Sequence, residues 1–214
     1  MNNYEKTLLR AEQVFLTYSR EEMIKACNLK ADENYLYIDF FRQPFRVSQT
    51  SGRVETKENG VYRHSTFSEG MSIFDYICEP VPYRCLSGEA VDIGYFAKVG
   101  FSGKDLYQHY VDAFEKNPEG FCAACENLGG TPVAKGDAGY IFEVFPDFPL
   151  TLILWTGEED IPAAMQYLWD KNTPDFIRYE TMFYIIGHIM EKIAAAMSCA
   201  VEPFAAVKAE TVHN

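Results

Sequence analysis

Carboxylates that follow a predicted strand are the residues best suited to chemistry in this sequence. The turn Gly157-Glu158-Glu159-Asp160 comes directly after a run of strand-forming residues that ends at Trp155, and functional residues often lie on loops at strand ends. With Asp170 and Glu180, Glu159 could serve in general acid–base catalysis or bind a hard cation. The alternative, which we favour, is a solvated turn, since a chain with net charge −12 carries acidic clusters by composition. The candidate catalytic residues are therefore Glu159, Asp170 and Glu180.

A second set of candidates lies along the same predicted strands. Gly136-Asp137 is typical of a turn whose carboxylate accepts backbone N–H bonds, so we expect a structural task for Asp137. A pocket lined by tyrosines and Trp155, with few polar anchors, would suit a small or planar ligand. The candidate ligand-binding residues are Asp137, Tyr140, Trp155 and Glu159.

Six cysteines are scattered along the chain, and two of them form the motif Cys122-Ala-Ala-Cys125. A redox motif of this kind places its first cysteine at a helix N-terminus, whereas here the motif lies a turn inside a predicted helix. A zinc site would need two more ligands, for which Cys78 and Cys85 are the available cysteine pair. We favour buried, free thiols, and we expect no metal and no cofactor. The zinc set Cys78, Cys85, Cys122 and Cys125 stays open as the alternative.

The histidines offer weaker signals. His188 lies opposite the apolar stripe of its predicted helix, on the same face as Tyr184 and Glu191, which share helical spacing with it. That arrangement could orient a base, but an exposed histidine is the simpler interpretation. His64 has no partner pattern in the sequence. No phosphate-binding loop, nucleophile elbow or zinc-protease motif is found either, which favours a role other than catalysis.

Charge narrows the range of partners. There are 19 basic and 31 acidic residues and no basic run, so nucleic acid and anionic membrane surfaces are not expected partners. The N-terminus lacks the charged-then-apolar pattern of a signal peptide, and the longest apolar run is far short of the ~20 residues that span a bilayer. Scattered cysteines in a chain long enough to fold without disulfides indicate a reducing cytoplasm.

Periodicity and capping signals predict the elements that would position these residues. Apolar residues at helical spacing, Ser/Thr caps and Pro or Gly stops predict two helices in the first thirty residues and further helices over 66–78, 102–114, 117–128 and 179–197. Runs of strand formers between turn dipeptides predict strands over 35–41, 45–48, 53–56, 61–64, 95–99, 131–134, 140–145 and 150–155. The segment 161–169 is ambiguous between strand and helix.

The predicted strands come in blocks rather than alternating with helices. This order favours an α+β fold with largely antiparallel sheets, packed by several helices that include a long C-terminal one. We expect a single domain over residues 1–200, with lobes 1–98 and 99–200 as a possible subdivision, and a loosely held tail over 201–214.

A series of short motifs in the second half of the chain carries a family resemblance. They are Leu128-Gly129-Gly130, Gly136-Asp137-Ala138, Phe148-Pro149-Leu150, Leu154-Trp155-x-Gly157-Glu158-Glu159, Ile161-Pro162-Ala163, Leu168-Trp169-Asp170 and Glu180. Their order and spacing resemble a family of small prokaryotic proteins, common in anaerobes, known as domain of unknown function family 3786. The resemblance implies no established reaction. Some relatives carry an iron–sulfur module, which this chain lacks, and Thr181 stands where relatives have a second acidic residue after Glu180.

Three functions remain open from the sequence. The aromatic content of 15% and the missing catalytic signatures favour a non-catalytic protein that binds a small ligand or has an accessory role. The family resemblance implies that such a role would belong to anaerobic metabolism. A small enzyme with a carboxylate-based site is the first alternative, and a protein-interaction scaffold is the second. The partner would be a small molecule or a protein, and the sequence does not determine the oligomeric state.

Overall fold

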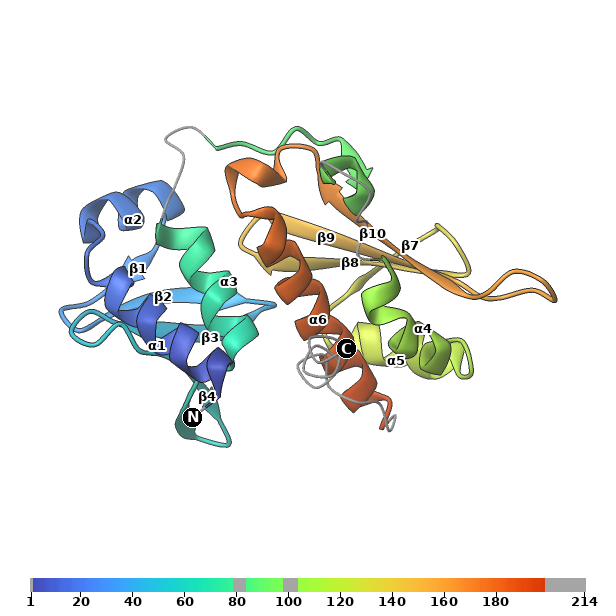
Figure 1. The fold of residues 1–214 in the computed structure, drawn as a ribbon, viewed down its shortest axis with the longest axis horizontal. Coiled ribbons are helices and arrows are strands. Elements are labelled where there is room, and N and C mark those ends of the chain that lie inside the picture. The colour runs from blue at the N-terminus through green and yellow to red at the C-terminus, as the bar shows by residue number, and fades with distance from the viewer. Residues whose placement is uncertain (1, 79–83, 98–103, 199–214) are drawn as a thin grey trace. The chain divides into compact units, whose positions relative to one another are not determined.

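The protein combines helices with two antiparallel sheets, as the sequence predicts. The structure, a computed structural model, describes residues 2–78, 84–97 and 104–198. Within these residues the chain forms two five-stranded antiparallel sheets and several helices, of which the last is the longest (Figure 1). The prediction of an α+β fold is therefore confirmed.

The first sheet is a meander with strand order β1-β2-β3-β4-β5. Its strands are β1 (Lys30–Ala31), β2 (Tyr35–Phe40), β3 (Gln43–Ser48), β4 (Val54–Glu58) and β5 (Val61–His64). Two-residue turns join β2 to β3 and β4 to β5, and both residues of each turn have positive φ: 49° and 58° at Phe41 and Arg42, 49° and 83° at Asn59 and Gly60. Such turns match the twist of a hairpin. The short strand β1 is an element that the sequence analysis did not predict.

Three helices precede or follow this sheet: α1 (Asn3–Phe15), α2 (Arg20–Cys27) and α3 (Phe67–Cys78). The helix predicted over 66–78 is confirmed, and a capping box starts it: Thr66 N–H donates to Glu69 Oε2 at 2.8 Å and Glu69 N–H donates to Thr66 Oγ1 at 3.3 Å. Apolar residues alternate along β2, where Leu36, Ile38 and Phe40 are buried. Figure 1 shows α1 and α3 lying side by side over this sheet.

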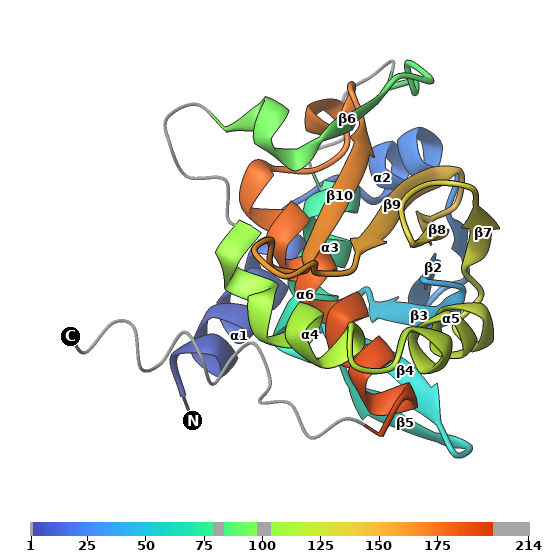
Figure 2. The same ribbon diagram turned by 90° about the vertical axis from the view of Figure 1, so that its right-hand side faces the viewer.

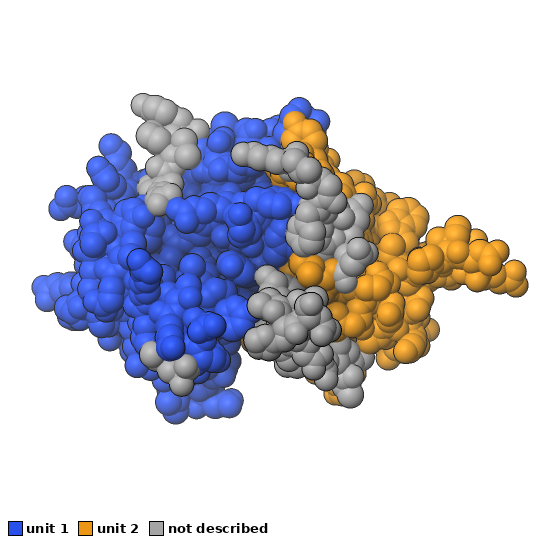
Figure 3. All heavy atoms as spheres, viewed as in Figure 1, with its two compact units in different colours: residues 1–89, 144–148, 171–185 blue, residues 90–143, 149–170, 186–214 orange. Residues whose placement is uncertain are grey.

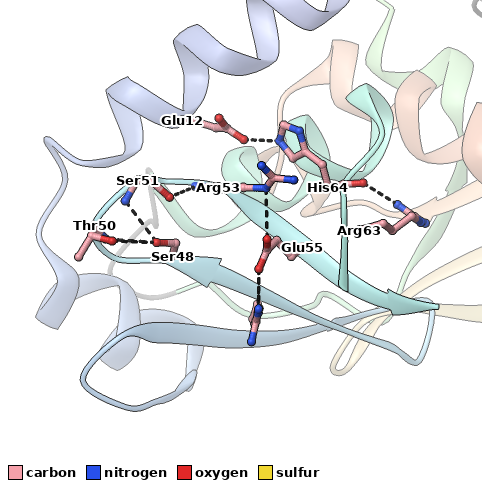
Figure 4. Close-up of polar contacts among 9 residues, drawn as sticks. Glu12, Ser48, Thr50, Ser51, Arg53, Glu55, Arg63 and His64 are labelled. Atoms are coloured by element: carbon pink, nitrogen blue, oxygen red, sulfur yellow. Dashed lines mark hydrogen bonds and ion pairs between the residues drawn. The ribbon is translucent and has the colours of Figure 1, made fainter. Parts of the chain in front are cut away.

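A short hydrogen bond links α1 to the far edge of the first sheet. Glu12 is 4% exposed, and its Oε1 lies 2.5 Å from Nε2 of His64 at the end of β5 (Figure 4). Gly52, in the turn before β4, has φ +74°, and a Cβ there would overlap the carbonyl oxygen of Glu12. Glycine is therefore required where this turn meets the helix backbone. His64, for which the sequence offered no partner, thus has one.

The second sheet has the strand order β6-β10-β9-β8-β7 (Figure 2). Its strands are β6 (Ala90–Asp92), β7 (Thr131–Val133), β8 (Ala138–Phe145), β9 (Phe148–Trp155) and β10 (Ala164–Asp170). The ambiguous segment 161–169 is therefore mostly strand. It alternates buried and less buried residues along β10 and pairs antiparallel with β9 from Ala164 to Trp169, as a strand with two unlike faces requires.

The remaining helices are α4 (Gln108–Phe114), α5 (Pro118–Asn127) and α6 (Tyr179–Ala196), with 3-10 turns at Ile93–Phe96, Lys104–Tyr107 and Thr173–Asp175. Asn117 caps α5, and its side-chain oxygen accepts from Gly120 N–H at 2.9 Å. The predicted strand over 95–99 is wrong where it can be compared, because a Gly94 N–H bond to the Asp92 side chain starts a 3-10 turn there. The predicted helix start at residue 102 lies outside the described residues.

The chain divides into two compact units, each built from separate segments (Figure 3). The first contains residues 1–89, 144–148 and 171–185, and the second contains residues 90–143, 149–170 and 186–214. The predicted tail 201–214 lies outside the described residues. Among the helices of the described ranges, none combines the length and the apolar character needed to cross a membrane.

Candidate ligand-binding site

The first unit contains a pocket of about 330 Å³ at one end of its sheet. Small-molecule sites commonly start at about 300 Å³ and combine apolar walls with a few polar groups. Six chain segments reach this pocket. Its lining comprises Ala26, Cys27, Asn28, Leu29, Lys30, Tyr37, Ile38, Asp39, Tyr76, Arg84, Pro146, Asp147 and Phe176.

Arg84 is the central polar residue of the pocket. Its guanidinium donates to the carbonyl oxygen of Tyr76 at 2.9 Å and contacts Sγ of Cys27. It also lies over the rings of Tyr76 and Phe176, 4.5 and 5.5 Å from their centroids. The side chain is half-buried, and both hydrogen-bond partners are neutral. Within the described chain no carboxylate forms an ion pair with Arg84, although Asp39 and Asp147 line the same pocket.

Stacked aromatic rings form one wall and hold Arg84 in place. Tyr76, near the end of α3, is 6% exposed and stacks on Phe145 with centroids 4.0 Å apart. Phe176 stacks on Phe148 at 4.9 Å. Burial raises the pKa of Tyr76 to about 12, so its hydroxyl stays neutral at ordinary pH. The guanidinium therefore rests on a rigid apolar support, where cation–π attraction also favours it.

Cys27 lies at the end of α2, and its thiol donates to the carbonyl oxygen of Tyr76 at 3.7 Å. Burial raises the pKa of the Cys27 thiol, and the nearby Arg84 guanidinium lowers it only in part. The thiolate is the nucleophilic form of cysteine. A raised pKa keeps Cys27 protonated near neutrality, which favours a packing and hydrogen-bonding role over nucleophilic catalysis.

Lys30 of β1 and Tyr37 of β2 also line the pocket, and Asp32, in the turn between these strands, bonds to Tyr37. Lys30 pairs in register with Tyr37, whose hydroxyl donates to Asp32 Oδ2 at 2.6 Å. That hydrogen bond, with those from the backbone N–H groups of Asn34 and Tyr35, lowers the pKa of the Asp32 carboxyl. Asp32 thus stays ionised and fixes the Tyr37 ring beside the pocket.

The predicted carboxylates are not gathered in one unit. Glu159 is exposed in the turn after β9, and Asp170 is 6% exposed at the end of β10; both belong to the second unit, whereas Glu180 belongs to the first. Glu180 lines another pocket of about 310 Å³, where Asp75 pairs with Arg178. Across the described ranges, no three His, Cys, Asp or Glu side chains are arranged to hold a metal ion. A catalytic role for these three carboxylates stays a prediction.

Two of the predicted ligand-binding residues use their polar groups within the second unit. Asp137 Oδ2 accepts from the backbone N–H and the hydroxyl of Thr156 at 2.7 and 2.9 Å, and these bonds lower the Asp137 pKa. Tyr140 is buried, and its hydroxyl bonds to Glu126 Oε1 at 3.2 Å. Trp155 is 48% exposed at the end of β9. The bonds of Asp137 and Tyr140 describe structural tasks, and ligand binding by this set stays a prediction.

The cysteines of the second unit lie in α5. Cys125 is fully buried, and burial raises its pKa, while Cys122 lies partly exposed next to Tyr140. Cys78 and Cys85 belong to the first unit, and within the described residues these four cysteines form no disulfide. His188, expected to be exposed, is buried at 6% exposure.

Sequence reasoning did not single out Cys27, Tyr76 or Arg84. Each residue had an ordinary interpretation: Cys27 and Tyr76 belong to helices, and Arg84 lies just after a stretch with two prolines. An arginine between aromatic residues far apart in the sequence is a signal only once the fold brings them together.

Comparison with known proteins yields a family but no characterised relative. A family model described as "Domain of unknown function (DUF3786)" matches residues 20–192, a span that includes every residue lining the pocket. No curated protein and no solved structure matches the chain.

Proposed function

We propose that this chain, which belongs to the DUF3786 family of domains of unknown function, binds a small anionic organic ligand in the first-unit pocket without transforming it. One observation carries the proposal: Arg84 is a half-buried cation that faces the pocket and has no carboxylate partner in the described chain. A charge removed from water is costly unless it is paired. A ligand carboxylate or phosphate would supply the missing partner.

The other arginines of the first unit with identified ion pairs show the contrast. Arg46 and Arg53 share Glu55, Arg63 pairs with Glu69 and Glu58, and Arg178 pairs with Asp75. Arg84 instead contacts a carbonyl oxygen and a thiol. Lys30 adds a second positive charge to the pocket lining. Asp39 and Asp147 also line the pocket, so its charged groups balance, and the preference for an anion rests on Arg84, which no carboxylate pairs with in the described chain. The rings of Tyr76 and Phe176 favour an apolar body attached to the anionic group.

Binding rather than catalysis is supported by the state of the pocket's reactive groups. The raised pKa values of Cys27 and Tyr76 keep both neutral near pH 7. An activated nucleophile would need the opposite shift.

A thermal-shift screen of the full chain tests the proposal. The panel holds small carboxylates and phosphate monoesters, each with a matched neutral amide or alcohol, such as 3-phenylpropanoate with 3-phenylpropanamide. Ligands that bind the folded state raise the melting temperature, and we expect this for anionic members only. Equal shifts for the neutral analogues, or no shift across the panel, would contradict the proposal.

The variant Arg84→Gln tests whether the anionic ligands found in the thermal-shift screen bind in this pocket. A hydrogen bond to a charged group contributes about 1.5–3 kcal/mol, so we expect the dissociation constant to rise about 10- to 100-fold by calorimetry. The matched control is Arg10→Gln, which removes the same charge from an exposed position on α1 outside the pocket. Wild-type affinity in Arg84→Gln would place the anion elsewhere.

A further inference from the structure

The edge of strand β2 is open for one residue beside the pocket. Strand β1 pairs with only two residues of β2, Lys30 with Tyr37 and Ala31 with Leu36. If β1 were longer, this register would next place Asn28 opposite Asp39. Asn28 instead ends α2 in the left-handed conformation, with φ 50° and its N–H bonded to Ile24 O, so the chain leaves the sheet before it reaches Asp39.

The backbone of Asp39 points toward this open edge. Phe40 and Gln43 flank the two-residue turn between β2 and β3, and residues that flank such a turn exchange backbone hydrogen bonds. Because bonded and non-bonded pairs alternate along an antiparallel ladder, the next pair, Asp39 with Pro44, does not bond. Pro44 has no N–H to donate. The N–H and C=O of Asp39 therefore face away from β3.

Neither group finds another partner in the described chain. Phe41 follows the end of β2, and its N–H is the next one that faces away from β3. This N–H donates to Val144 O at 2.8 Å. No corresponding bond satisfies Asp39, and both Asp39 and Asn28 line the pocket. The pocket thus contains a backbone donor and a backbone acceptor spaced as in a strand, together with Arg84, which has no ion pair in the described chain.

We propose that the ligand is peptide-like: a carboxylate that pairs with Arg84, joined to a secondary amide that pairs with the Asp39 backbone. The amide C=O accepts from Asp39 N–H, and the amide N–H donates to Asp39 C=O, as when a peptide adds to the edge of a sheet. This inference rests on the proposed function, since it assumes that Arg84 binds the carboxylate. Short peptides with a free C-terminus and N-acylated amino acids carry both groups.

Three probes that share a 3-phenylpropanoate core separate the amide from the carboxylate, and the amide and ester among them are matched in size. N-acetylphenylalanine carries both groups, 2-acetoxy-3-phenylpropanoate replaces the amide N–H by an ester oxygen, and 3-phenylpropanoate has the carboxylate alone. One net hydrogen bond is worth about 0.5–1.5 kcal/mol, so we expect the ester to bind the full chain about 2- to 13-fold more weakly than the amide. Equal affinity of amide and ester, or no binding by all three, overturns the inference.

A pair of variants tests the backbone donor itself. Asp39→Ala removes the side chain and keeps the N–H, whereas Asp39→Pro removes both. Proline is tolerated where a strand N–H faces outward, and circular dichroism checks that the variant folds. We expect Asp39→Pro to bind N-acetylphenylalanine several-fold more weakly than Asp39→Ala, with little difference for 3-phenylpropanoate. If the two variants bind the amide equally, the inference fails.

The outcomes distinguish this inference from the function on which it rests. Carboxylates that bind through Arg84 without any preference for the amide would leave the proposed function standing and overturn the peptide-like ligand. Should Asp39→Pro not fold, the comparison of amide with ester decides alone.

Discussion

The first-unit pocket and a second region contain similar residue types but use them differently. The second region, which we call the β7–β9 edge, comprises Asp137, Tyr140 and Thr156 around strands β7 to β9 of the second unit. At the β7–β9 edge, Asp137 is bonded to Thr156 and Tyr140 to Glu126, so these polar groups have their partners within the chain. In the pocket, Arg84 has no carboxylate partner and the Asp39 backbone has no strand partner among the described residues. Residue type alone therefore does not mark a site; hydrogen-bonding capacity left unused inside a concavity is the better sign.

The largest expected effect is the loss of stability from adding a side chain at Gly136, at the β7–β9 edge. Gly136, next to Asp137, has φ +64°, and a Cβ there would overlap Ile153 Cγ2 and lie 2.8 Å from Leu154 O. Because the backbone conformation and the contact both oppose a side chain, Gly136→Ala should lower the free energy of unfolding by about 2–4 kcal/mol. Urea unfolding followed by tryptophan fluorescence measures this loss.

Gly60→Ala is the matched control for that substitution. Gly60 also has a positive φ, +83°, but a methyl group at this position would have no atom within 4 Å, so the loss should be only about 1 kcal/mol. If Gly136→Ala also weakened binding of a carboxylate probe more than Gly60→Ala did, the β7–β9 edge would take part in binding and the contrast would break.

Two tyrosines give a smaller and more specific comparison. Tyr140→Phe removes the hydroxyl that bonds to Glu126 at 3.2 Å, which should cost about 1 kcal/mol. For Tyr76 no hydrogen bond of the hydroxyl is found in the described chain, and its ring stacks on Phe145. Tyr76→Phe keeps that stacking and should therefore change the free energy of unfolding by less than about 0.5 kcal/mol.

Chemical denaturation of both variants checks the difference. A larger loss for Tyr76→Phe than for Tyr140→Phe would show that the pocket tyrosine has a structural bond, and the two regions would then be alike in this respect.

The sequence predicted the elements better than the site, for a physical reason. Helix caps such as Thr66 and Asn117 and the turn Asn59-Gly60 act within a few residues, so local patterns reveal them. Asp137 accepts a backbone N–H as expected, but the donor is Thr156, 19 residues along the chain, which a local pattern does not reveal. Strand β1 was missed because two residues carry no periodicity, yet its short length is what leaves the Asp39 edge open.

The pocket could not be predicted because its chemistry is assembled over long sequence separations. Cys27 and Arg84 are 57 residues apart, and Phe176 comes from a third segment. An isolated arginine in sequence is expected to be solvated or paired. Only the fold shows that Arg84 is half-buried on aromatic rings and faces a cavity.

The smallest expected effect concerns acid stability at the β7–β9 edge. Hydrogen bonds from Thr156 lower the pKa of Asp137, so its carboxylate stabilises the fold above the unfolded pKa of about 3.9, and this contribution is lost as the pH falls through the lower folded pKa. Asp137→Asn removes the ionisation, so the melting temperature should fall less steeply below about pH 4 than in the wild type.

Glu159→Gln is the control, because it makes the same charge change on an exposed turn without removing such bonds. In this variant the melting temperature should fall with decreasing pH as steeply as in the wild type. If the melting temperature of Asp137→Asn fell below pH 4 as steeply as that of the wild type, Asp137 would not be held by Thr156 in solution. Its carboxylate would then be available to a ligand, as we propose for the guanidinium of Arg84.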